Sequence, residues 1–115
     1  MAILNKDAIL ASNDLPKEEV QVDEWGGSVY VRTMTASERD RFETHFRPGQ
    51  NVRALLAVCT VCDENGKAIF DESDVTALGA KSAAALDKVF TVAIRLNGIG
   101  KRDVEELEGE SPASH

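Results

Sequence analysis

Residues 20–32, VQVDEWGGSVYVR, are the stretch that decides the fold. Valines alternate with polar residues on both sides of a glycine pair, which is the pattern of two strands that share one buried face. Gly26 and Gly27 can adopt the positive φ angles that a tight two-residue turn requires. We therefore predict a β-hairpin over Glu18–Met34.

The two-glycine turn also predicts the register of this hairpin. It places Val22 opposite Val31, so that valines meet on the buried face. On the other face Gln21 meets Arg32. Trp25 then lies beside the turn on the more polar face, and we expect its side chain to be exposed.

The rest of the chain has mostly helical signals. Apolar residues recur at spacings of three and four, and residues 35–38 have the form of a capping box. The predicted helices are Lys6–Ala11, Thr35–Phe46, Val52 to about Val61, a short one from Ser73 or Asp74 to Leu78, and a long one from Ala80 or Lys81 to Leu96. The end of the third is ambiguous, because residues 58–62 also have strand composition. Asn65 and Gly66 signal a small second hairpin.

Together these segments predict an α+β fold, a mainly helical small domain with an N-terminal β-hairpin. The domain would cover residues 1–107, and residues 108–115 would form a flexible polar tail. The chain has 115 residues, of which 43% are hydrophobic. That is enough for a single modest core.

Charge and hydropathy narrow the classes of function. Thirteen Lys and Arg against twenty Asp and Glu give a net charge of −7. Phosphate backbones repel such a protein, so we expect no nucleic-acid binding. No apolar run approaches the ~20 residues that a membrane span needs, so we expect no membrane partner. The N-terminus lacks the basic and apolar regions of a signal peptide, and the expected compartment is a cytoplasm.

The residues that could carry chemistry form no catalytic constellation. Cys59 and Cys62 have the CxxC spacing, but they close an apolar helix, whereas a redox pair follows a strand and opens a helix. A zinc site needs about four ligands, and the only histidines are His45 and His115. We predict buried structural cysteines, with a metal or thiol-redox module as a rival. We expect no enzyme, no cofactor, and no catalytic or metal-binding residues.

The segment Val52–Val61 is apolar on almost all sides, which indicates deep burial or a partner. Leu55, Leu56 and Val58 therefore belong either to the chain's own core or to a surface that a second chain covers. The sequence leaves both interpretations open.

Six stretches follow one another between about Leu4 and Leu107, and none of them is a catalytic signature. They are DLP at 14–16, VQVDEWGGSVYVR at 20–32, ERDRFE at 38–43, NVRA at 51–54, LGAKSAAAL at 78–86 and RLNG at 95–98. This arrangement resembles the tail assembly chaperones of bacteriophages with long, non-contractile tails, in their short form.

The resemblance implies a non-enzymatic role in the cytoplasm of an infected bacterium. Such a chaperone binds the tape-measure protein, keeps it soluble and supports assembly of the tail tube, and it is absent from the mature virion. A frameshift-extended form would contact the tail tube protein. The resemblance also implies a homo-oligomer. The sequence has no glycine-rich phosphate loop, so we expect no nucleotide site.

Five residues are candidates for the surface that binds the partner. Trp25 and Tyr30 are chosen because we expect them to be exposed on the hairpin. Leu55, Leu56 and Val58 are chosen because their helix is more apolar than one buried face requires.

The rival function is an acidic inhibitor, a DNA mimic that binds a basic host protein. The net charge and the acidic run at residues 103–110 support it. Against it, the acidic residues are scattered along the chain and have basic neighbours.

Overall fold

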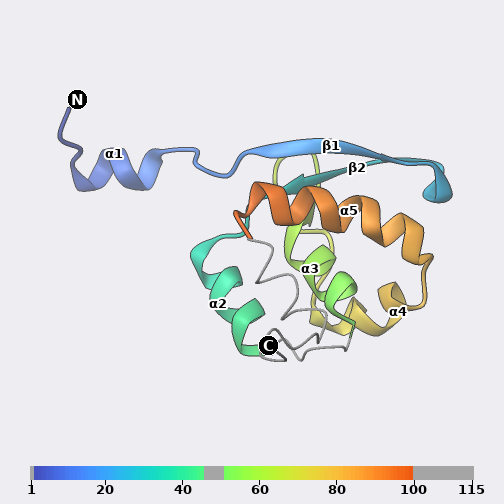
Figure 1. Ribbon diagram of the computed structural model, residues 1–115. Coiled ribbons are helices and arrows are strands. Elements are labelled where there is room, and N and C mark those ends of the chain that lie inside the picture. Colours follow the sequence, from blue (N-terminus) through green and yellow to red (C-terminus); the bar gives the residue numbers. More distant parts are fainter. Residues whose placement is uncertain (1, 46–50, 100–115) are drawn as a thin grey trace, which may run out of the picture.

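The computed structural model describes residues 2–45 and 51–99 (Figure 1). Its helices are α1 (Lys6–Ala11), α2 (Ala36–His45), α3 (Val52–Thr60), α4 (Val75–Gly79) and α5 (Ala83–Leu96), its strands are β1 (Lys17–Val22), β2 (Gly27–Arg32) and β3 (Val61–Cys62), and its two 3-10 turns are η1 (Asp23–Trp25) and η2 (Glu72–Asp74). The described residues form an α+β fold that is mainly helical and has an N-terminal β-hairpin. The predicted fold class is confirmed.

The strands form one antiparallel sheet in the order β1-β2-β3, and helices pack against it. Figure 1 shows α5 running along the hairpin and α3 below it. The core lies between these layers. Its fully buried side chains include Val22 and Val31 from the sheet, Leu56 from α3 and Val89 from α5.

The register of the hairpin differs from the predicted one. Val22 pairs with Gly27 rather than with Val31. The shift is four residues, an even number, so each side chain keeps its predicted face. Val20 and Val22 therefore remain buried although their partners have changed.

The cause of the shift is the turn. Asp23–Trp25 form a 3-10 turn, and Gly26 closes it with a φ of +77°. The Gly26 N–H donates to the Asp23 carbonyl at 3.0 Å. Gly27 already belongs to β2, so the predicted two-residue glycine turn is wrong. A glycine pair is compatible with the two-residue turn and with the longer 3-10 turn. The glycines alone therefore do not determine which turn forms.

The turn can be tested by comparing its two glycines. Gly26→Ala places a Cβ on left-handed backbone and should lower the free energy of unfolding by about 1 kcal/mol. At Gly27 a Cβ would meet no atom within 4 Å. Gly27→Ala should therefore change stability by less than about 0.5 kcal/mol. Urea denaturation measures both, and equal losses would indicate the two-residue turn, in which both glycines have positive φ.

A buried ion pair joins the end of β2 to the first turn of α2. Arg32 Nη1 and Nη2 donate to the two carboxylate oxygens of Glu38 at 2.7 and 2.8 Å. The two side chains are only 4% and 15% exposed. Thr35 and Glu38 also form the predicted capping box, with the Thr35 N–H donating to Glu38 Oε1 at 2.8 Å and the Glu38 N–H donating to Thr35 Oγ1 at 3.1 Å. One carboxylate thus serves both the helix cap and the ion pair.

Asn97, the C-cap of α5, holds the same region from the other side. The Met34 N–H donates to Asn97 Oδ1 at 2.7 Å, and Asn97 Nδ2 donates to the Ala93 carbonyl at 2.8 Å. Arg39 Nη1 on α2 donates to the Asn97 carbonyl at 3.1 Å. The connection from β2 to α2 is therefore fixed to the end of α5.

The remaining boundaries follow from local capping. Helix α3 ends at Thr60, and of residues 58–62 only Val61 and Cys62 become a strand, β3, which pairs with β2. The predicted second hairpin is reduced to a single bridge between Cys62 and Ala68. Helix α5 begins at Ala83 because Ser82 Oγ accepts from the Ala85 N–H at 3.3 Å. Phe46 and the predicted tail at 108–115 lie outside the described residues.

The charge of Glu38 has a consequence for stability. Burial raises the pKa of this carboxyl, but hydrogen bonds from Arg32 and from the Thr35 backbone outweigh burial, and the pKa lies below its ordinary value of 4.5. A carboxyl whose pKa is lowered by folding stabilises the folded chain above its unfolded-state pKa. That contribution is lost as the pH falls through the folded-state pKa.

Glu38→Gln keeps an oxygen for the helix cap but removes the charge that faces Arg32. We expect it to lower the free energy of unfolding at neutral pH by about 3 kcal/mol, as breaking a buried pair does. The deficit should shrink as the pH falls below 4.5, because Glu38 itself then becomes protonated. Urea denaturation at neutral and acidic pH measures this.

The matched control is Glu43→Gln, which breaks the exposed i,i+4 pair with Arg39 on the same helix. It should cost less than about 0.5 kcal/mol. Similar losses for the two variants would contradict the role assigned to the buried pair.

Candidate functional site

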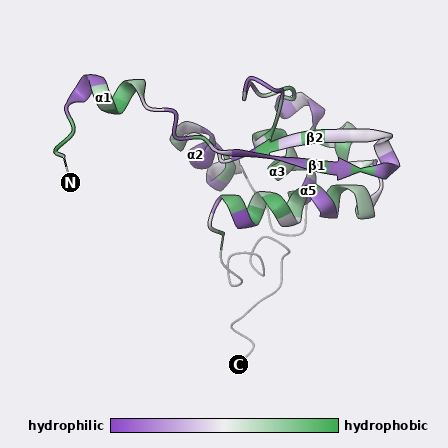
Figure 2. Cartoon of the chain, turned by 90° about the horizontal axis from the view of Figure 1, so that it is seen from above, coloured by the Kyte–Doolittle hydropathy of each residue, from purple (hydrophilic) through white to green (hydrophobic). Residues whose placement is uncertain are grey.

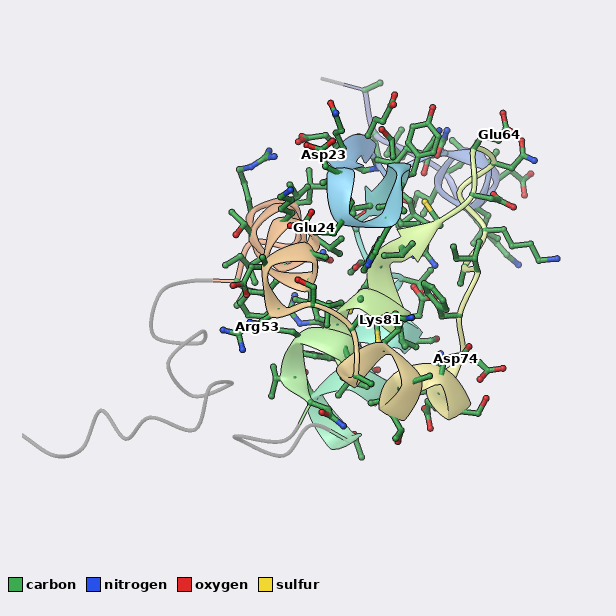
Figure 3. The ribbon with its side chains drawn as sticks, turned by 90° about the vertical axis from the view of Figure 1, so that its right-hand side faces the viewer. Asp23, Glu24, Arg53, Glu64, Asp74 and Lys81 are labelled. Carbon is green, nitrogen blue, oxygen red and sulfur yellow. The ribbon has the colours of Figure 1, made fainter. Side chains whose placement is uncertain are left out.

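The best candidate site is an apolar groove between the hairpin turn and α4. Its cavity volume is about 260 Å³. We call it the Trp25 groove, and its lining residues are Trp25, Phe70, Asp74, Ala77, Leu78 and Lys81. Figure 3 shows Asp74 and Lys81 on the face below the hairpin turn that carries Asp23 and Glu24.

Two turns bring the lining residues together. The 3-10 turn η1 turns Trp25 back against the core, where it is half-buried. The expectation that Trp25 is exposed is therefore wrong, because the predicted turn lacked this fold-back. An ion pair of 2.7 Å between Glu24 and Lys88 fixes the turn to α5, and the hydrogen bond from Lys88 lowers the pKa of Glu24.

The other wall is built by η2 and α4. Asp71 and Asp74 form a capping box, in which the Ser73 N–H donates to Asp71 Oδ1 and the Asp71 N–H donates to Asp74 Oδ2, both at 2.9 Å. This cap orients α4 so that Leu78 is buried and Ala77 remains exposed.

The groove is apolar inside and charged at its edge. Asp74 supplies a carboxylate and Lys81 an ammonium group. The cavity volume lies just below the range of about 300–1,000 Å³ that is typical of small-molecule sites. The groove therefore suits a few apolar side chains of a protein segment, with charged residues next to them, better than a whole cofactor.

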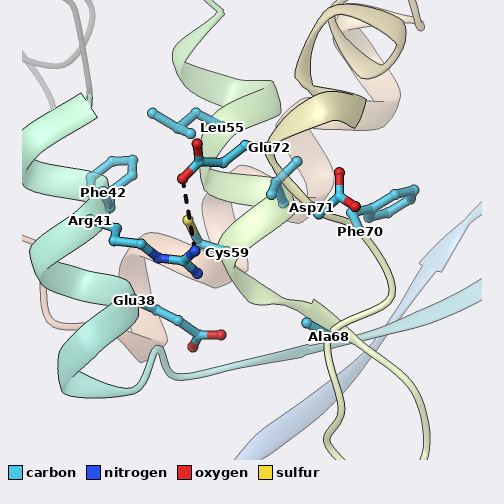
Figure 4. Close-up of a pocket in the computed structure, with 10 residues that line it drawn as sticks. Glu38, Arg41, Phe42, Leu55, Cys59, Ala68, Phe70, Asp71 and Glu72 are labelled. Atoms are coloured by element: carbon cyan, nitrogen blue, oxygen red, sulfur yellow. Dashed lines mark ion pairs between the residues drawn. The ribbon is translucent and has the colours of Figure 1, made fainter.

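A second cavity, of about 80 Å³, lies between α2, α3 and η2 (Figure 4). Arg41 and Glu72 face each other across it, with their charged atoms 3.8 Å apart. Cys59 also lines it. The volume is far below that of a small-molecule site, so this cavity is a weaker candidate.

The two cysteines are buried and free, which confirms the prediction of buried cysteines. Within residues 2–45 and 51–99, no three His, Cys, Asp or Glu side chains are placed to hold a metal ion. The rival metal or redox module thus gains no support from the geometry of Cys59 and Cys62.

Three of the five predicted partner-binding residues lie in the chain's own interior. Leu55, Leu56 and Val58 are buried, because α5, α4, α2 and the sheet pack around α3. Of the two interpretations of this apolar helix, the structure shows the intramolecular core. These residues are not available to a partner in this conformation.

The two hairpin candidates lie apart from each other. Trp25 is in the groove, whereas Tyr30 is half-buried on the opposite face of the sheet from Val29 and Val31. The Lys17 ammonium lies 5.5 Å from the centre of the Tyr30 ring. Only Trp25 therefore belongs to the candidate site.

Sequence analysis missed the other lining residues of the groove. Phe70, Ala77 and Leu78 come from a loop and a one-turn helix far from Trp25 in the chain, and no local pattern joins them. The sequence analysis also predicted the helix at Lys6–Ala11 without considering its apolar residues as a binding surface.

Comparisons of the chain with protein-family models, with curated proteins and with solved structures find no match. The function is therefore argued from the residues and their geometry. None of the helices among the described residues has the length and apolar character to cross a bilayer.

The burial of the cysteines predicts low thiol reactivity. Burial raises the pKa of Cys59 to about 11, from an ordinary value of 9.0, and also raises that of Cys62. At pH 8 the Cys59 thiolate should be about 100-fold scarcer than that of an ordinary thiol. Ellman's reagent should react slowly with the native chain and rapidly in urea. A rapid native reaction would instead favour the redox module.

Proposed function

We propose that this chain is a tail assembly chaperone, a non-enzymatic protein that binds the tape-measure protein and keeps it soluble. It acts in the cytoplasm of an infected bacterium, supports assembly of the tail tube and is absent from the mature virion. A frameshift-extended form would contact the tail tube protein. The resemblance of six stretches over most of the chain supports this role.

The single observation that carries the proposal is the Trp25 groove. An amphipathic helix binds a partner by laying apolar side chains into a groove of this kind. A tape-measure protein is long and helical, so it offers such side chains repeatedly. Asp74 and Lys81 at the edge of the groove can pair with charges of either sign on the client helix.

The net charge supports the same role. A chain with a charge of −7 repels further copies of itself at a distance. A client coated with many copies would therefore stay in solution. The mechanism is stoichiometric binding, without turnover.

The rival function, an acidic mimic of DNA, fits the described residues less well. Five carboxylates of the described surface form ion pairs with Arg or Lys, which interrupt the negative field. They are those of Glu18, Glu24, Glu43, Glu72 and Asp87. The acidic run at 103–110 lies outside the described residues.

The proposal is tested by co-expression with the cognate tape-measure protein. Ala77 is exposed in the groove, so Ala77→Glu places a carboxylate among apolar residues without disturbing the core. We expect it to reduce the soluble client by about tenfold or more, because a carboxylate that the client's apolar side chains cover loses its hydration, which costs well over 1.4 kcal/mol.

The matched control is Ala36→Glu, the same change at an exposed alanine that begins α2. It should leave client solubility unchanged. A client that precipitates with the wild-type chain would reject the chaperone proposal. A client that Ala77→Glu solubilises as well as wild type would reject the groove as its binding site.

A further inference from the structure

Helix α1 stands away from the rest of the described chain. Figures 1 and 2 show it projecting beyond the sheet, and none of its residues is buried. We call residues 3–11 the N-terminal arm. Its four large apolar side chains are Ile3, Leu4, Ile9 and Leu10, which are 96%, 64%, 54% and 74% exposed.

The arm has the signals of a helix that forms on a surface. Asn5 Oδ1 accepts from the Ala8 N–H at 2.8 Å, and the Ser12 hydroxyl donates to the Ile9 carbonyl at 2.8 Å, so both ends are capped. Leu4 and Ile9 occupy the two positions that a hydrophobic staple joins. Helices shorter than about 12 residues are marginal in water on their own. A capped helix of six residues therefore needs an apolar surface to pack on.

The Trp25 groove offers such a surface. It is apolar inside, and its edge carries Asp74 and Lys81. The first turn of the arm carries one charge of each sign, Lys6 and Asp7, directly before its apolar residues. Lys6 can pair with Asp74 and Asp7 with Lys81 while Ile9 and Leu10 enter the groove. The arm and the groove are therefore complementary in hydropathy and in charge.

The arm cannot readily reach the groove of its own chain. Figures 1 and 2 place α1 and the turn that carries Trp25 at opposite ends of the hairpin. The linker gives six Cα–Cα steps from Ala11 to Lys17, which extend at most about 21 Å. To bring the arm to the groove, it would have to fold straight back over the five steps of β1, about 17 Å, and then pass the turn that carries Trp25. A fully extended linker would therefore only reach the level of the turn, with no slack for the arm to enter the groove.

We infer that the N-terminal arm docks in the Trp25 groove of a second copy of this chain. The contact is heterologous, since it joins two different surfaces. In such an assembly the copies at the two ends still have a free arm or a free groove, to which a further copy can bind. If two copies exchange arms, no surface stays free and the assembly is a closed dimer. This inference goes beyond the chaperone proposal and does not depend on it, because both surfaces belong to this chain.

The test is the mass of the full chain in solution, measured by size-exclusion chromatography with light scattering over about a hundredfold range of concentration. The wild-type mass should exceed the 12.5 kDa of one chain and rise with concentration. Leu10→Glu on the arm and Ala77→Glu in the groove should each leave only the monomer. The matched controls Ala8→Glu on the arm and Ala36→Glu on α2 should behave as wild type.

Mixing the two disrupted variants provides the sharper readout. Leu10→Glu retains an intact groove, and Ala77→Glu retains an intact arm. An equimolar mixture should form a one-to-one dimer that grows no further, although each variant alone is monomeric. A monomeric wild type, a variant that still associates, or a mixture that stays monomeric would each overturn the inference.

These results are separate from those of the chaperone proposal. The mass measurements use the chain alone, whereas client solubility is scored in co-expression. Leu10→Glu leaves the groove intact, so it should abolish self-association and still solubilise the client. If only the client fills the groove, Leu10→Glu changes neither readout and the arm inference fails alone.

Discussion

The buried pair between Arg32 and Glu38 is the interaction on which the arrangement of the layers depends. It joins the central strand to the first turn of α2, and Asn97 attaches the same connection to the end of α5. A desolvated ion pair adds little net stability compared with apolar packing, but it is costly to break. The role of this ion pair is therefore to fix the position of α2. It holds α2 at one angle, and α2 in turn covers one side of α3.

The packing of α2 against α3 explains why α3, the most apolar helix, is not a binding surface. Helix α3 lies against α2, α4, α5 and the sheet, so an apolar face on every side is what its position requires. Once α3 is covered, the apolar surface left for a partner lies elsewhere. Among the described residues it lies in the Trp25 groove, which is formed by packing, and in the N-terminal arm, which is left outside the packing, with Ile69 as a further exposed apolar side chain.

Features that depend on neighbouring residues could be predicted from the sequence, and features that depend on distant ones could not. The capping box at Thr35 and the end of the last helix at Leu96 are local, and both were predicted. The hairpin register was wrong because a glycine pair suits two turns, and an even shift keeps the buried face unchanged. The groove was missed because Trp25 and Ala77 meet only after the layers have packed.

The arm and a client helix would be the same kind of ligand for one groove. Each lays apolar side chains into the Trp25 groove, so occupancy of a groove by one excludes the other. Self-association would then hold grooves closed when no client is present, and a client with many apolar segments would displace the arms one at a time. A client segment displaces the arm only if it binds the groove more tightly than the arm does. The arm therefore keeps weakly binding apolar segments out of the groove. A short, marginal helix is suited to that role, since its ordering cost keeps its own affinity low.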